Sequence, residues 1–170
     1  MKISRDTQLF LRKILVYFAI MLAVALIQTS FLAVLAPFGA VPDLVLAVSL
    51  GAGYFCSPTV GAVFGVFSGT VAYALGDTGL ALLPLVYGAV GFASGVLVQK
   101  IFKGKFAVWC IYSAGGALVK GTYSFLCCMM FSGEFRLWTV LLKTLLPEFI
   151  GTVIICAALY IPIKKLCKLL

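Results

Sequence analysis

The sequence predicts an all-α protein with six membrane-spanning helices in a single domain, 1–170, and three observations lead to this prediction. Mean hydropathy is +1.19, and charged residues make up 11% of the chain, against about 25% in soluble domains. The apolar residues fall in runs of about 20, the length that crosses a ~30 Å hydrocarbon core. Basic residues gather at the ends of these runs, as they do beside membrane spans.

The basic residues also predict which side of the membrane each loop occupies. The chain carries 13 Lys and Arg against five Asp and Glu, a formal net charge of +8. Most of the cations form three short groups: Lys2, Arg5, Arg12 and Lys13; Lys100, Lys103 and Lys105; and Lys164, Lys165 and Lys168. Because positive charge is enriched in cytoplasmic loops, we expect both termini and the Lys100 loop in the cytoplasm. Groups so far apart argue against one basic face that binds nucleic acid.

The boundaries of the six helices follow from the apolar runs and the turn residues. We expect helices at about 14–36, 44–56, 59–75, 80–98, 106–131 and 145–162. Without a break, residues 44–75 would form one helix of about 48 Å, too long for the bilayer core. Pro58 disfavours helix at the residue before it, so we divide this stretch at Ser57-Pro58. The division also keeps the Lys100 loop on the cytoplasmic side.

The start of the last helix has two interpretations, which differ in the role of Pro147. A start near Trp138 places Pro147 in the helix interior, where it produces a kink. A start near Leu145 places Pro147 in the first turn, where proline is tolerated, and leaves 134–144 on the outer surface. We prefer the second interpretation, because Glu148 then lies near the positive end of the helix dipole.

Glycines recur at helical spacing in two of the expected helices. Gly61, Gly65 and Gly69 share one helix face, and Gly91 and Gly95 repeat the spacing. In lipid such a face lets another helix backbone approach closely. The preferred interpretation is packing within the protein, and the alternative is a docking face for the single helix of a partner.

Lys120 and Glu148 are the two opposite charges that we expect within the membrane. A charge at that depth costs about 2.5–3.5 kcal/mol on insertion scales, so Lys120 should face protein or water. We hypothesise an intramembrane ion pair that ties the fifth helix to the sixth. The alternatives are a lysine that extends to the interface and a residue that binds a substrate or partner. Asp43, which follows Pro42 in the first outer loop, is expected to cap the second helix, because Asp is a preferred N-cap.

The motifs of the common enzyme classes do not occur in the sequence. The chain has no histidine, no HExxH, no GxSxG and no phosphate-binding loop. Its six cysteines contain no CxxC and lie mostly in apolar runs, as small packing residues do. We therefore expect a protein that is not an enzyme, with no catalytic site, no cofactor and no metal.

Six short motifs occur in a fixed order along the chain. They are Gln28-Thr29-Ser30, Val41-Pro42-Asp43-Leu44-Val45-Leu46, the glycine-spaced 61–69, Gly76 to Gly79, Leu85 to Phe92, and Leu145-Leu146-Pro147-Glu148 ahead of a helix ending in Leu159-Tyr160-Ile161-Pro162. As a set they resemble the bacterial rod shape-determining protein MreD family, as do the length and the basic tail. The chain departs from that pattern shortly after the glycine-spaced segment, where the family often has an acid: this chain has Gly69-Thr70-Val71-Ala72-Tyr73, and the nearest acid is Asp77.

The resemblance implies a non-enzymatic scaffold of the cell-elongation machinery, in the bacterial inner membrane. Such a protein would bind MreC, a partner with one transmembrane helix, in a groove beside the glycine-lined helices. It would act near the cytoskeletal protein MreB and the glycosyltransferase and transpeptidase that make side-wall peptidoglycan, and so help to maintain rod shape.

A second class of protein fits the same composition and helix number. The substrate-binding S component of an energy-coupling factor vitamin transporter also has six helices, and the two families are expected to share a fold. An S component needs a pocket of polar and aromatic groups near the outer face. The residues available for such a pocket are Gln28, Asp43, Tyr87, Lys120, Tyr123 and Glu148.

Overall fold

A computed structural model describes residues 5–32, 41–75, 81–100, 105–132 and 145–169. Nearly all of them are helical, and no strand occurs among them, so the all-α prediction is confirmed for this part of the chain. The elements are α1 (Arg5–Ile27), the π-helical turn η1 (Gln28–Leu32), α3 (Leu44–Phe55), α4 (Pro58–Leu75), α5 (Leu83–Lys100), α6 (Phe106–Ser132) and α8 (Leu146–Leu169). The expected turn at 76–79 and the expected surface segment 134–144 lie outside the described residues.

Three of the predicted boundaries need correction. The first helix begins at Arg5 rather than at 14, because residues 5–13 include Gln, Leu, Arg and Lys, which favour helix. The fourth begins at Leu83 rather than at 80, immediately before Pro84, which suits a first turn. The last runs through Pro162 to Leu169.

Packing accounts for the continuation of α8 beyond Pro162. Ile163, the next residue, is 4% exposed and packs so closely on Gly51 of α3 that a side chain on Gly51 would collide with it. A proline removes one backbone hydrogen bond, and neighbouring helices compensate for such a loss in membrane proteins. Tertiary contact, rather than local preference, therefore decides where this helix ends.

The two proline-marked boundaries of the sequence analysis appear where they were predicted. Cys56 and Ser57 separate α3 from α4, and the Ser57 hydroxyl accepts a hydrogen bond from the Val60 amide at 3.2 Å. Pro58 is the first residue of α4. Pro147 is the second residue of α8, so the later start of the last helix is confirmed.

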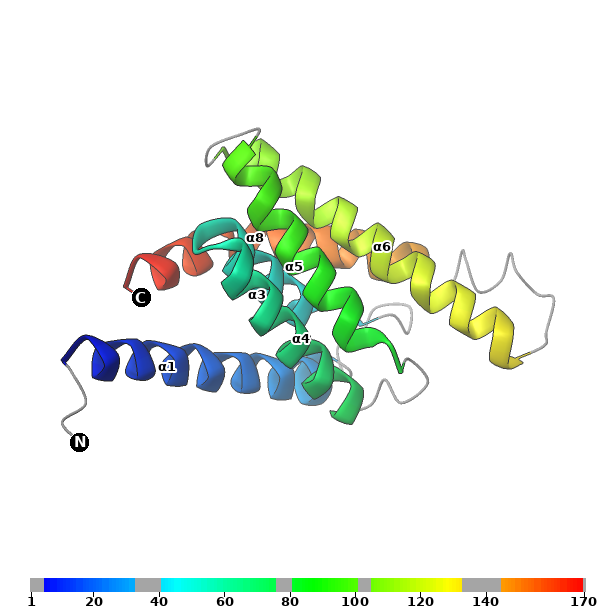
Figure 1. The fold of residues 1–170 in the computed structure, drawn as a ribbon. Coiled ribbons are helices and arrows are strands. Elements are labelled where there is room, and N and C mark those ends of the chain that lie inside the picture. Colours follow the sequence, from blue (N-terminus) through cyan, green and yellow to red (C-terminus); the bar gives the residue numbers. More distant parts are fainter. Residues whose placement is uncertain (1–4, 33–40, 76–80, 101–104, 133–144, 170) are drawn as a thin grey trace.

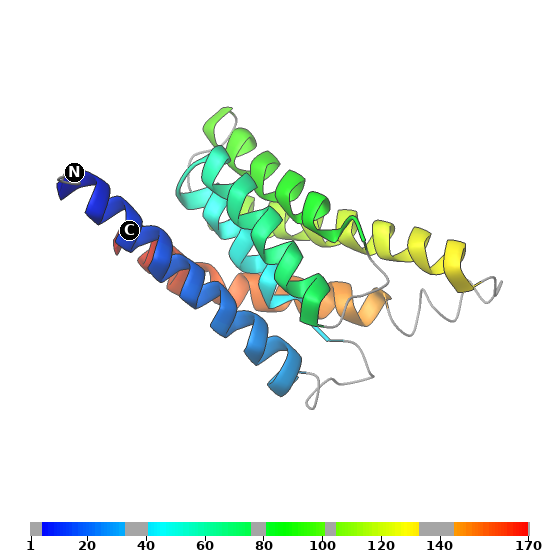
Figure 2. The ribbon, with the colours of Figure 1, turned by 60° about the horizontal axis from the view of Figure 1, so that its bottom comes forward.

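Helix α3 is the centre of the bundle. It contacts each of the other five α-helices, and Figures 1 and 2 show the others arranged around it. Every residue from Val45 to Tyr54 is buried. A helix that is apolar or small on all sides is one that other elements cover completely, and α3 has this composition.

The glycine faces form the contact between α4 and α5. A Cβ atom on Gly69 would lie 2.5 Å from the Cα of Pro84, and one on Gly95 would lie 2.6 Å from the Cα of Pro58. Gly61 abuts the backbone of Gly91, and Gly65 abuts that of Tyr87, at distances that admit no side chain. These glycines are therefore packed within the chain, and α5 occupies the face on which a partner helix would dock.

Helix length and composition bear on the membrane prediction. Two helical segments, Pro58–Leu75 and Leu146–Lys165, are long and apolar enough to cross a membrane. Three shorter apolar helical segments accompany them: Leu15–Ser30, Leu44–Phe55 and Leu83–Gln99. The described residues are thus compatible with membrane association through two helices. The six-span topology stays a prediction from the sequence.

Lys105 and Lys164, each from a different basic group, lie at one end of the bundle. The Tyr54 hydroxyl at the end of α3 donates to the Lys105 carbonyl at 3.0 Å. Phe106, the first residue of α6, packs on Tyr160 with ring centroids 5.2 Å apart. The Lys164 ammonium lies 5.3 Å from the centre of the same Tyr160 ring. The start of α1 is at this end as well (Figures 1 and 2).

Substitution of Gly65 tests the close approach of α4 and α5. We expect Gly65→Ala to lower the free energy of unfolding by about 1–3 kcal/mol, because the new methyl group collides with a backbone that cannot move without separating the helices. Gly115→Ala is the matched control: no atom lies within 4 Å of a Cβ there, and alanine favours helix by ~1 kcal/mol. Thermal unfolding in mild detergent measures both, and equal stability of the two variants would contradict the packing.

Candidate functional site

Asp43 is the first member of a buried polar cluster. Its side chain caps α3 as expected, since Oδ1 accepts a hydrogen bond from the Leu46 amide at 2.9 Å. Its own amide donates to the Thr152 hydroxyl of α8 at 3.0 Å. Pro42 packs on Gly151 of the same helix. These contacts bring Asp43 into the interior, where it is 1% exposed.

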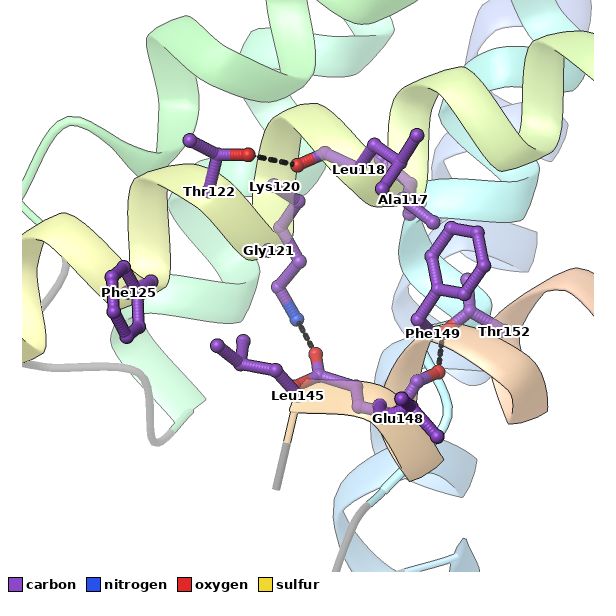
Figure 3. Close-up of a pocket in the computed structure, with 12 residues that line it drawn as sticks. Ala117, Leu118, Lys120, Gly121, Thr122, Phe125, Leu145, Glu148, Phe149 and Thr152 are labelled. Atoms are coloured by element: carbon purple, nitrogen blue, oxygen red, sulfur yellow. Dashed lines mark hydrogen bonds and ion pairs between the residues drawn. The ribbon is translucent and has the colours of Figure 1, made fainter. Parts of the chain in front are cut away.

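Lys120 lies between two carboxylates. Its ammonium is 2.5 Å from Glu148 Oε1, so the structure contains the ion pair between α6 and α8 that the sequence suggests (Figure 3). It is also 2.9 Å from Asp43 Oδ2. Sequence reasoning missed this second partner. The available signal was that Asp43 is the single acidic or basic residue between Gln28 and Gly69, which marks it as a residue in need of a counter-charge.

Three further polar residues complete the cluster. The buried Tyr87 hydroxyl of α5 donates to Asp43 Oδ2. The Thr152 hydroxyl donates to the Glu148 carbonyl at 2.7 Å. Gln28, in the π-helical turn η1, accepts from the Val45 amide at 3.0 Å and so caps α3 beside Asp43. Tyr123, another residue considered for a pocket, lies elsewhere and accepts from the Leu82 amide at 2.9 Å.

The charges of this cluster balance. The two carboxylates contribute −2 and the ammonium +1. Asp43 caps α3 and Glu148 lies in the first turn of α8, and each helix N-terminus carries roughly +0.5 charge. The sum is close to zero, so the cluster is stable in a low-dielectric interior as long as every member is present. Its immediate effect is structural, because it joins α3, α5, α6 and α8.

A cavity of about 320 Å³ lies beside the cluster, between α6 and α8. Figure 3 shows Lys120 reaching from α6 toward Glu148, with Phe125 and Phe149 on either side. The lining residues are Leu46, Ala117, Leu118, Lys120, Gly121, Thr122, Phe125, Leu145, Leu146, Glu148, Phe149 and Thr152. Apolar walls and a few convergent polar groups are the usual composition of a small-molecule site.

Within the described ranges, the acidic and cysteine side chains form no metal-binding arrangement. No three of them lie together as metal ligands would. The absence of an enzymatic activity, a cofactor and a metal stays a prediction from the sequence.

Comparison of the chain with protein-family models, with curated proteins and with solved structures finds no match.

Replacement of Lys120 tests the charge balance. We expect Lys120→Met to cost about 3–5 kcal/mol of stability, because it leaves the buried carboxylate of Asp43 and the partly buried one of Glu148 without their cation. The triple change Asp43→Asn, Lys120→Met, Glu148→Gln should recover part of that loss, since no unpaired charge remains. Thermal unfolding of the parent, the single variant and the triple variant measures this. A Lys120→Met variant as stable as the parent would refute the structural role of the cluster.

Proposed function

We propose that the protein is a non-enzymatic membrane scaffold of the bacterial cell-elongation machinery, similar to MreD. It is a multi-pass protein of the inner membrane with six spans and both termini in the cytoplasm. One observation carries the proposal. Gln28, Asp43, Tyr87 and Glu148 come from four separate motifs on which the resemblance rests, and these motifs meet around Lys120 and the start of α3. Short apolar motifs that are weak singly thus form one three-dimensional unit.

The outer surface supports a membrane location. Large hydrophobic side chains are exposed on each of the five helices around α3, and examples are Leu15 (68%), Val63 (67%), Leu85 (62%), Ile111 (67%) and Ile154 (62%). Soluble monomers rarely expose apolar patches beyond a few hundred Å². Lipid around the bundle accounts for this distribution, with Lys105 at the start of α6 and Lys164 near the end of α8 together at one face of the membrane.

The polar interior supports a scaffold rather than a catalyst. Asp43, Lys120 and Glu148 neutralise one another and hold helices together. The rigid bundle would present an apolar side to the transmembrane helix of an MreC-like partner, near MreB and the peptidoglycan synthases. Because α5 fills the glycine face, that helix would pack on an outer face and not against Gly61, Gly65 and Gly69.

The S component of a vitamin transporter is the second candidate, and the cavity between α6 and α8 favours it. An S component would hold its substrate there and dock on a transporter module that contains ATPases. The two candidates differ in what accompanies the protein from the cell.

Mild-detergent purification of the tagged chain decides between these functions. We expect an MreC-like protein with one transmembrane helix to co-purify and to be identified by mass spectrometry. Gly115→Leu, a variant that leaves the fold intact, is the control. Recovery of a bound vitamin together with transporter ATPases, and no MreC-like protein, would replace the scaffold with the S component.

The six-span topology has its own test. In a background without native cysteines, we expect Ala81→Cys to react with an impermeant maleimide from outside the cell. Lys105→Cys and Lys165→Cys should react only after the membrane is opened. All three positions are exposed, so lack of labelling reports the side of the membrane and not burial. Labelling of position 165 and position 105 from opposite sides would contradict the topology.

A further inference from the structure

The cavity between α6 and α8 retains hydrogen-bonding capacity on its polar side. A lysine ammonium has three N–H donors, and the carboxylates of Asp43 and Glu148 engage two of those of Lys120. Glu148 uses Oε1 for the ion pair, and its other oxygen has no protein partner among the described residues. Lys120 is 8% exposed and lines the cavity. One N–H donor of Lys120 and one carboxylate oxygen of Glu148 thus remain available, on two residues that both line the cavity.

The balance of charge decides which chemical group fits there. The carboxylates, the ammonium and the two helix N-termini already sum to about zero. A carboxylate head would lie against Glu148, and an ammonium head would lie against Lys120. A hydroxyl group is uncharged, accepts from the remaining N–H of Lys120 and donates to the remaining oxygen of Glu148. A neutral head of this kind is therefore favoured over either charged one.

The rest of the cavity is suited to an apolar body. Apart from Thr122 and Thr152, its walls are leucine, phenylalanine, alanine and glycine residues, among them Leu46, Phe125 and Phe149. Two lining residues, Leu118 (57%) and Leu146 (44%), are also exposed on the outer surface of the bundle. The cavity therefore opens beside the apolar surface that contacts lipid, and a ligand dissolved in the membrane can enter from the side.

We propose that this cavity binds a neutral amphiphile from the lipid phase, with its hydroxyl group between Lys120 and Glu148 and its hydrocarbon chain along Leu46, Phe125 and Phe149. The inference rests on the membrane location of the proposed function and is independent of an MreC-like partner. The volume of about 320 Å³ is at the lower end for ligand pockets, so the site accommodates one chain or part of one.

Gly121 offers a way to fill the cavity without disturbing the backbone. A Cβ atom there would meet a single atom, Cδ2 of Leu145, at an ordinary 3.8 Å. Gly121→Leu therefore places a side chain in the ligand's space, and the change also favours helix. Gly115→Leu is the matched control, because Gly115 lies on the same helix, is exposed, has no atom within 4 Å of a Cβ and does not line the cavity.

The experiment compares three ten-carbon probes in thermal unfolding of the detergent-purified full chain: decan-1-ol, decanoate and decylamine. A ligand that binds only the folded state raises Tm. We expect decan-1-ol to raise Tm by several degrees in the parent and in Gly115→Leu, and to have no such effect in Gly121→Leu. Decanoate and decylamine should raise it less. An equal rise for all three probes, or a rise with decan-1-ol that persists in Gly121→Leu, would overturn the proposal.

A second measurement is independent of stability. In Phe125→Trp, whose new indole lies in the cavity wall, 10-bromodecan-1-ol should quench the added fluorescence in a saturable way. The added Gly121→Leu change should abolish the saturation. Quenching that rises linearly in both variants would show partition into the detergent alone and would overturn the site. Loss of probe binding together with retention of an MreC-like partner would reject this inference and leave the scaffold function in place.

Discussion

A lysine ammonium held between two carboxylates is the interaction on which this bundle depends. Lys120 of α6 contacts Asp43 at the start of α3 and Glu148 in the first turn of α8, and Tyr87 of α5 binds the same Asp43 oxygen. Apolar surfaces distinguish poorly between one helix register and another in lipid, because lipid is itself as apolar as a leucine side chain. Buried charges distinguish well, since a rotated or shifted helix leaves a charge without its partner. The cluster therefore specifies which faces of four helices meet.

The glycines determine how closely the helix backbones approach, whereas the charges determine the register of the helices. Gly69 and Gly95 bring α3, α4 and α5 together at backbone contact, and these three helices lie side by side (Figure 2). Helices α6 and α8 meet through longer side chains, and Lys120 and Glu148 need space between their backbones to extend toward each other (Figure 3). The cavity lies beside that pair, between the two helices.

The sequence reveals what local rules control. Pro58 and Pro147 mark real helix boundaries, and the depth of Lys120 and Glu148 suggests their pairing. The predicted start of the first helix is wrong because it rests on the boundary between polar and apolar residues, which marks where the chain meets water. Helix-favouring residues continue beyond that boundary, and the helix begins at Arg5. Asp43 is harder. Its role as a helix cap explains one carboxylate oxygen completely, and nothing in the neighbouring residues tells that the other binds a lysine 77 positions away.

No rule based on neighbouring residues predicts the cavity. Its walls come from residues that are distant in sequence, and its volume depends on the distance between α6 and α8. Its position beside the ion pair has an energetic consequence. A hydroxyl group bound to the remaining donor of Lys120 and the remaining oxygen of Glu148 leaves the existing pair unbroken. Binding then adds contacts across the same two helices, and by linkage it must stabilise the folded bundle that it binds. A head group that captured Glu148 from Lys120 would bind more weakly, because it would have to break that pair and leave Lys120 with Asp43 alone. The arrangement of the charges therefore selects ligands that strengthen the contact between α6 and α8.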